Sequence, residues 1–315
     1  MVTARPDPCL IGLDWGSTSL RAWLIALDGI VLAERGSGKG ASTLTEHTAF
    51  VTAFDELTLE WRTARPGLPV LACGMVGSSH GWLDVPYARC AAGQAELAAG
   101  MARVSNGPHV VPGLMFDEAG QPPDLMRGEE TQILGALHVE PKLIEASCIV
   151  LPGTHSKWAQ VADGLVTRFS TYMTGELYAL LRQHSVLGRL IPSEPAEDPD
   201  AFLEGVDAAQ QHGEEGLSHQ LFAVRTLGVT QRMRAGALAD YLSGLLIGHE
   251  IQSGLAWRAQ AGLPEQPLVL VGEPRLCARY AQALAHVRVP ASRVLDNVAP
   301  AGLLAVARAA GLLPA

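Results

Sequence analysis

The chain has 315 residues, of which 48% are apolar, and a formal net charge of −9. This length favours about two domains, and the apolar fraction is enough to build a core in each. The basic residues are dispersed, which excludes the clustered positive charge of a nucleic-acid-binding protein. No apolar run is long enough to cross a bilayer, so neither nucleic acid nor a membrane is an expected partner.

The five cysteines are odd in number and never form a CxxC pair, so neither a disulfide framework nor a zinc site is expected. The first residues lack the apolar stretch of a signal peptide. We therefore expect a globular protein of the reducing cytoplasm that acts on a small molecule.

Strand-like and helix-like segments alternate along the chain, a pattern typical of an α/β protein. In chain order, the predicted strands span residues 10–13, 20–27, 30–36, 69–73, 109–112, 148–151, 158–162, 165–170 and 268–271. The predicted helices span residues 47–63, 93–102, 129–138, 175–183, 199–211, 220–225, 237–260, 275–285 and 300–310. Residues 191–200, IPSEPAEDPD, are expected to form an acidic, proline-rich surface loop.

Residues 148–170, CIVLPGTHSKWAQVADGLVTRFS, repeat the plan of residues 10–36, LIGLDWGSTSLRAWLIALDGIVLAERG. Each segment contains an apolar strand, a glycine with hydroxyl residues, a second strand, an Asp-Gly turn and a third strand. Glycine supplies the positive φ that such a hairpin turn needs. The repeat therefore predicts two related halves.

The turn between the first two strands of each segment has the composition of a phosphate-binding loop. Glycine lets the backbone approach closely, so several N–H groups and hydroxyls can be aimed at one anion. Two such loops, facing one another across a cleft, can bind successive phosphates of a nucleotide. Asp14 adds a carboxylate suited to Mg²⁺, and Lys157, one of only three lysines, accompanies the second loop. Alternatively, each loop is a long hairpin turn, Asp14 is a cap and Lys157 is a solvated charge.

Five motifs in order, DWGSTSLRAWL, GMVGSSHGW, MRGEETQILGA, LPGTHSKW and TGELYALLRQHSVLG, resemble those of the 2-dehydro-3-deoxygalactonokinase family. This family lies within the sugar kinase, heat-shock chaperone and actin superfamily. The resemblance implies an α/β protein of two ribonuclease-H-like domains, with the active site in the interdomain cleft. It also implies phosphorylation of 2-dehydro-3-deoxy-D-galactonate at its 6-hydroxyl, with ATP and Mg²⁺, in galactonate breakdown.

The resemblance divides the chain into an N-terminal lobe of residues 1–133 and a C-terminal lobe of residues 134–315, with the final helix packing back on the first lobe. It assigns the nucleotide to Gly16, Ser17 and Thr18 of the first loop, to Gly153, Thr154, His155, Ser156 and Lys157 of the second, and to Gly272. The last of these lies in LVLVGEPRLCARYAQAL, which resembles an adenosine motif. Glu273 and Pro274 depart from the usual small pair there.

Phosphorylation of the sugar acid needs a carboxylate of the protein that accepts the proton of the sugar hydroxyl. It also needs hydrogen-bond donors that bind the sugar acid's own carboxylate. Glu129 and Glu130 begin a predicted helix, where the dipole favours anions; the resemblance makes a glutamate here the base, with Asp14, the metal ligand, as its competitor. A helix cap is the structural alternative. The expected substrate-binding residues are Ser78, Ser79, Trp82, Arg127 and Glu176.

Two other functions remain open from the sequence. An exopolyphosphatase-like phosphohydrolase would use the same loops with water as acceptor. An actin- or chaperone-like nucleotide switch would need an additional partner-binding segment. A kinase for a related 2-keto-3-deoxy sugar acid is a further alternative, and a homodimer is one option for its assembly.

Overall fold

The computed structural model describes residues 6–260 and 265–313. The chain forms two compact units. The first unit contains the residues up to Ser147, the segment Ala159–Phe169 and the residues from Asn297 onward. The second contains Cys148–Trp158 and Ser170–Asp296.

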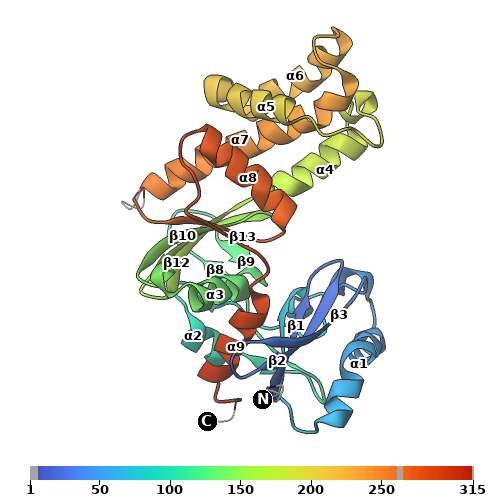
Figure 1. Ribbon diagram of the computed structural model, residues 1–315, viewed down its shortest axis with the longest axis vertical. Helices are drawn as coiled ribbons and strands as arrows, with labels where there is room; N and C mark the ends of the chain where they lie inside the picture. The colour runs from blue at the N-terminus through green and yellow to red at the C-terminus, as the bar shows by residue number, and fades with distance from the viewer. Residues whose placement is uncertain (1–5, 261–264, 314–315) are drawn as a thin grey trace, which may run out of the picture. The chain divides into compact units, whose positions relative to one another are not determined.

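A six-stranded sheet organises the first unit, in the order β3-β2-β1-β4-β7-β6. Its first three strands in the chain are labelled in Figure 1. Its strands are β1 (Pro8–Trp15), β2 (Leu20–Ala26), β3 (Val31–Ser37), β4 (Val70–Gly74), β6 (Ala102–Arg103) and β7 (His109–Val110). The first three form an antiparallel meander, and β4 and β7 then continue parallel to β1. Apolar residues fill β1 and β4 because these strands are covered on both faces.

A five-stranded sheet has the order β12-β11-β10-β13-β14. Its strands are β10 (Ala146–Leu151), β11 (Ser156–Ala162), β12 (Leu165–Tyr172), β13 (Leu268–Val271) and β14 (Arg293–Leu295). As in the first sheet, three consecutive strands are followed by two parallel ones. This shared order confirms the internal repeat, and Gly29 and Gly164 have the positive φ expected of their Asp-Gly turns.

All nine predicted helices are confirmed, with bounds that shift by a few residues. They are α1 (His47–Ala64), α2 (Gln94–Ala99), α3 (Glu129–Val139), α4 (Thr174–His184), α5 (Pro199–His212), α6 (Leu217–Val229), α7 (Leu238–Gln260), α8 (Pro274–His286) and α9 (Ala299–Ala309). None of the helices within residues 6–260 and 265–313 has the length and apolar character needed to cross a membrane. Strands β5 (Ala88–Arg89), β8 (Leu114–Phe116) and β9 (Asp124–Met126), which form a small third sheet, were not predicted, nor were β6 and β14.

Each unit has its own apolar core. In the first, the rings of Trp15, Phe50, Phe54 and Trp82 pack together between the sheet and α1. In the second, one cluster lies between the sheet, α7 and α8, and another joins α5, α6 and α7. Helix α9 packs on β1, where a Cβ on Gly12 would lie 2.9 Å from Leu303. These cores fix the ends of β1, β4, β10 and β13, where the candidate site residues lie.

Candidate active site

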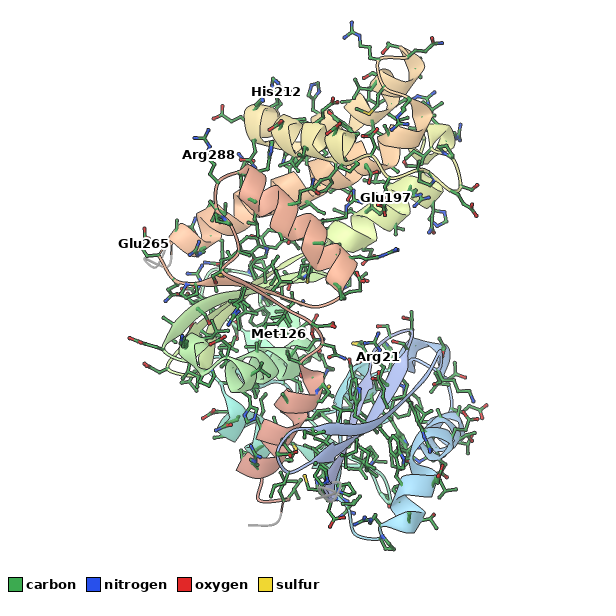
Figure 2. All side chains as sticks on the ribbon, in the orientation of Figure 1. Arg21, Met126, Glu197, His212, Glu265 and Arg288 are labelled. Atoms are coloured by element: carbon green, nitrogen blue, oxygen red, sulfur yellow. The ribbon has the colours of Figure 1, made fainter. Side chains whose placement is uncertain are left out.

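Three segments of the first unit converge at the end of β1. Asp14 lies next to the last residue of this strand, and its cross-strand partner is Arg21 of β2. Arg21 is labelled in Figure 2. Gly74, at the end of β4, has φ +92°, and a Cβ there would lie 2.7 Å from the Trp15 carbonyl oxygen. Gly128, which precedes α3 with φ +110°, would place a Cβ 3.3 Å from the Gly74 Cα. Only glycine permits this approach, which brings the start of α3 to Asp14.

Asp14, Glu129 and Glu130 are therefore brought together. Burial raises the pKa of Asp14 to about 6; the Arg21 charge opposes this rise and the Glu129 charge adds to it. Burial also raises the pKa of Glu130 to about 8, with a further contribution from Glu129. Such a concentration of negative charge in a partly desolvated place is typical of a functional site and suits a bound cation.

The two glutamates occupy different environments. Glu130 is 0% exposed, and its carboxylate accepts the Gly128 N–H at 2.6 Å and the Thr131 hydroxyl at 3.0 Å. Glu129 is half-buried and accepts the Arg127 N–H at 3.0 Å. Of the two carboxylates, only that of Glu129 has access to solvent, so only Glu129 can reach a diffusible substrate.

The first predicted phosphate loop follows Asp14 directly. Ser17 and Thr18 are exposed at its tip. Its backbone is held by a segment that the sequence did not single out: the Ala41 N–H donates to the Gly16 carbonyl at 2.9 Å, and the Ser42 N–H to the Ser17 carbonyl at 3.0 Å.

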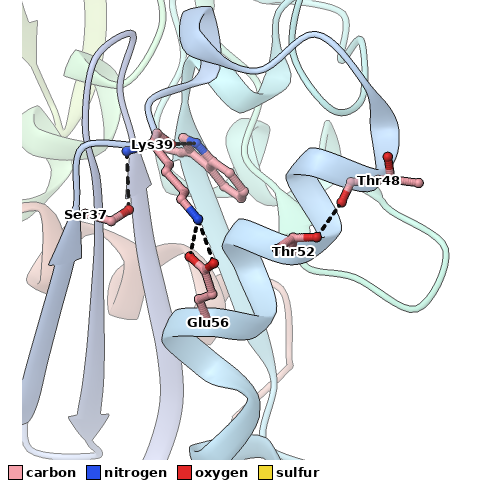
Figure 3. A network of polar contacts seen from close by, with 6 residues as sticks. Ser37, Lys39, Thr48, Thr52 and Glu56 are labelled. Atoms are coloured by element: carbon pink, nitrogen blue, oxygen red, sulfur yellow. Dashed lines mark hydrogen bonds and ion pairs between the residues drawn. The ribbon is translucent and has the colours of Figure 1, made fainter.

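This supporting segment is itself fixed to α1. The ammonium of Lys39 lies 2.6 Å from both carboxylate oxygens of Glu56 (Figure 3). The Lys39 carbonyl accepts the indole N–H of Trp15 at 3.0 Å. The path of the first loop is therefore set by contacts with residues more than twenty positions away.

Arg127 lies beneath the predicted substrate loop. It is 8% exposed, one terminal nitrogen donates to the Val85 carbonyl at 2.8 Å, and the guanidinium covers the ring of Tyr87 at 4.2 Å. Its other two nitrogens, Nε and Nη1, have no hydrogen-bond partner among residues 6–260 and 265–313. A Cβ on Gly77 would lie 2.9 Å from Nη1, which places this arginine against the loop.

Ser79 and Trp82 line a cavity of about 600 Å³ beside that loop. The indole of Trp82 donates to Nδ1 of His47 at 3.1 Å. Ser78 does not line this cavity; its hydroxyl donates to the Met75 carbonyl at 2.8 Å. The remaining lining comes mainly from residues 41–50, which the sequence did not assign to a site.

In the second predicted phosphate loop, Thr154 and His155 are exposed, whereas Ser156 and Lys157 are buried. The Lys157 ammonium donates to the Thr171 hydroxyl at 2.7 Å. The N-terminus of α4 packs on this loop: the Glu176 N–H donates to the Thr154 carbonyl at 3.0 Å, and the Glu176 carboxylate pairs with the His155 ring. Glu176, predicted as a substrate residue, thus contacts the second phosphate loop.

Gly272 follows the last residue of β13 with φ +146°, and a Cβ there would lie 3.6 Å from the Pro152 carbonyl oxygen. This repeats the relation of Gly74 to Trp15 in the first unit. Glu273 caps α8 through the N–H groups of Arg275 and Leu276. A cavity of about 530 Å³ is lined by Glu273, Arg275 and Leu276, together with the start of α5, Asp240 and Arg279.

Metal binding by protein groups alone is not indicated: in the described part of the chain, no three His, Cys, Asp or Glu side chains are grouped to hold an ion. Mg²⁺ needs fewer protein ligands, since it keeps several waters and takes one or two carboxylates together with substrate phosphates. Asp14 fits this requirement as a single carboxylate ligand.

Comparison with known proteins adds independent evidence. The family model described as 2-keto-3-deoxy-galactonokinase matches residues 14–306. A 2-dehydro-3-deoxygalactonokinase of Escherichia coli is 35% identical over 301 residues, covering 95% of this chain and 97% of its own. A Sinorhizobium meliloti protein with the same designation superposes with a TM-score of 0.85 at 35% identity, covering 95% of this chain and 98% of its own.

More distant structures share the fold alone. A Porphyromonas gingivalis protein designated an N-acetylglucosamine kinase superposes with a TM-score of 0.50 at 12% identity, covering 95% of this chain and 98% of its own. The architecture is that of actin-like ATPases and sugar kinases. With a family match over most of its length, the chain belongs to the 2-keto-3-deoxy-galactonokinase family.

Proposed function

We propose that the protein transfers a phosphoryl group from ATP to the 6-hydroxyl of 2-dehydro-3-deoxy-D-galactonate, as a step of galactonate breakdown. Membership of the family over nearly the whole chain supports this activity. The single structural observation that carries it is the convergence of Asp14 and Glu129 beside an exposed loop of glycine and hydroxyl residues. Acids next to a phosphate loop suit transfer to an alcohol, where charge neutralisation and a proton acceptor are both needed.

The phosphates of ATP are assigned to the exposed parts of the two loops. Gly16, Ser17 and Thr18 offer backbone and hydroxyl donors in the first, and Thr154 and His155 in the second. Asp14 would hold Mg²⁺, which neutralises phosphate charge when bound. Gly272 and the cavity at the start of α8 are assigned to the nucleoside, whose ribose hydroxyls suit its polar lining.

Proton transfer is assigned to Glu129. A general base must come within hydrogen-bond reach of the hydroxyl that it deprotonates. Glu130 is enclosed, so its role is to hold Gly128 and Thr131 at the start of α3 and thereby aim its neighbour.

Arg127 is assigned to bind the carboxylate of the sugar acid. A buried guanidinium with two unpartnered nitrogens has lost its hydration without replacing it, which costs free energy unless a ligand completes the contacts. An arginine fork matches a carboxylate. Ser79 and Trp82 would contact the rest of the sugar chain from the neighbouring cavity.

A coupled assay of ADP release with a panel of 2-keto-3-deoxy sugar acids tests this function. We expect turnover that requires a sugar acid and is fastest with the galactonate derivative rather than its gluconate epimer. Phosphate release from ATP at the same rate without any sugar acid would indicate a phosphohydrolase and refute the proposal.

A further inference from the structure

A buried chain of hydrogen bonds ties the second phosphate loop to α7 and α8. Ser156 is 0% exposed, and its hydroxyl lies 3.0 Å from the phenolic oxygen of Tyr280 on α8. Tyr280 donates to Oε2 of Glu250 on α7 at 2.6 Å. The other oxygen of this carboxylate accepts the indole N–H of Trp158 at 2.9 Å. Glu250 thus holds both ends of the segment 156–158 that leaves the loop.

The direction of these hydrogen bonds follows from the number of protons available. Tyr280 has one hydroxyl proton, which it donates to Glu250, so the acceptors for the Ser156 proton are the phenolic oxygen of Tyr280 and the Glu250 carboxylate, both of them buried. The Ser156 oxygen then faces the Gly153 N–H at 3.4 Å. The Ser156 proton is therefore directed into the protein. The hydroxyl holds the two ends of the loop together and does not donate to a phosphate.

Glu250 also reaches the helix that covers the loop. It is 3% exposed, and burial raises its pKa. Hydrogen bonds from Thr174, Tyr280, Trp158 and Ser156 oppose that rise. Thr174 is the first residue of α4, the helix whose backbone donates to the Thr154 carbonyl. A carboxyl group at such depth is costly unless it is well hydrogen-bonded, and here its partners are the structural supports of one loop.

We propose that Glu250 and Tyr280 are positioning residues for nucleotide phosphate binding: they hold the segment from Gly153 to Ser156 in the form that presents Thr154 and His155 to the phosphates. Neither residue touches the substrate. The inference rests on the proposed function, since it requires that the second loop bind phosphate.

Two substitutions break the chain at different links. Tyr280→Phe removes the bridging hydroxyl, and Ser156→Ala removes the attachment on the loop. For each, we expect ADP affinity, measured by calorimetry, to fall about tenfold, the size of one or two lost hydrogen bonds. Adenosine affinity should change less than twofold, because adenosine has no phosphate. The KM for ATP should rise by a similar factor with the KM for the sugar acid unchanged, and the double variant should lose no more than one single variant.

Tyr241→Phe is the matched control, since Tyr241 is a buried phenol on α7 that packs in the separate α5–α7 cluster. It should leave ADP affinity unchanged. Equal losses for ADP and adenosine would assign Tyr280 to the packing of α8 and overturn the proposal, as would unchanged ADP affinity in both variants. If Tyr280→Phe does not fold, Ser156→Ala decides alone. A wild-type protein that binds ADP no more tightly than adenosine would instead refute the phosphate loop, and with it the proposed function.

Discussion

Gly40 and Ser17 are packed so closely that a Cβ on Gly40 would lie 2.3 Å from the Ser17 carbonyl oxygen. The first phosphate loop therefore depends on a glycine outside the loop itself. Gly40→Ala must displace Ser17 and Thr18, because backbone cannot yield as a flexible side chain does. We expect kcat/KM for ATP to fall at least about tenfold, a loss of roughly 1.4 kcal/mol of transition-state stabilisation.

Gly38→Ala is the control for this change, since a Cβ at Gly38 would meet no atom of the described residues within 4 Å. It should keep kcat/KM within about twofold of wild type. Equal activity of the two alanine variants would show that the contact between Gly40 and Ser17 does not support the loop.

Asp14→Asn tests the assigned metal ligand. The substitution keeps the shape of the side chain but removes the charge that Mg²⁺ needs, so kcat should fall about 100-fold or more. Thermal unfolding should show a folded protein, because removing a partly desolvated charge with a raised pKa relieves a cost. Asp28→Asn, in the turn that joins β2 to β3, should retain full activity. Wild-type turnover in Asp14→Asn would reject the metal assignment.

Arg127→Lys tests recognition of the acceptor's carboxylate. Lysine cannot reproduce the planar fork, so the KM for the sugar acid should rise roughly 10- to 100-fold with little change in the KM for ATP. Arg89→Lys, at an exposed arginine paired with Asp117, should change neither value. A rise in the KM for ATP alone would place Arg127 on the nucleotide instead.

Glu130 makes stability depend on pH. Its folded-state pKa of about 8 lies above the ordinary 4.5, so the folded chain binds a proton more tightly than the unfolded chain. The contribution of Glu130 to the free energy of unfolding is fully present below pH 4.5 and is lost as the pH rises through 8. The total loss is up to about 5 kcal/mol. Urea unfolding between pH 5 and 8 should show this decline, and Glu130→Gln should flatten it. An equally steep decline in the variant would assign the effect to other groups.

Much of the fold was predictable because its signals are local. The strands around Gly16 and Gly153 show their pattern within thirty residues, and the shared Asp-Gly turns reveal the repeat. Strands such as β5 and β14 contain two or three residues each, and their pairing depends on neighbours brought in by the tertiary fold. Helices were found because their apolar faces recur over ten or more residues.

The sequence predicts which types of residue form the candidate site, but it does not predict how deeply each of them is buried. The MRGEETQ motif gives no sign that Glu130 is enclosed and Glu129 is not, because burial depends on how Gly74 and Gly128 meet. Gly40 was missed since it lies in an ordinary Gly-rich turn. Glu250 had one available signal, an acid within the predominantly apolar helix 237–260, which a search for buried charges would have found.

Regiochemistry of the product tests the central claim most directly. Wild-type protein incubated with ATP, Mg²⁺ and 2-dehydro-3-deoxy-D-galactonate can be followed by ³¹P nuclear magnetic resonance with proton correlation. The account predicts one new phosphate monoester, coupled to the protons on carbon 6 and formed in equal amount with ADP. ADP accompanied only by inorganic phosphate, or an ester at another carbon, would contradict it.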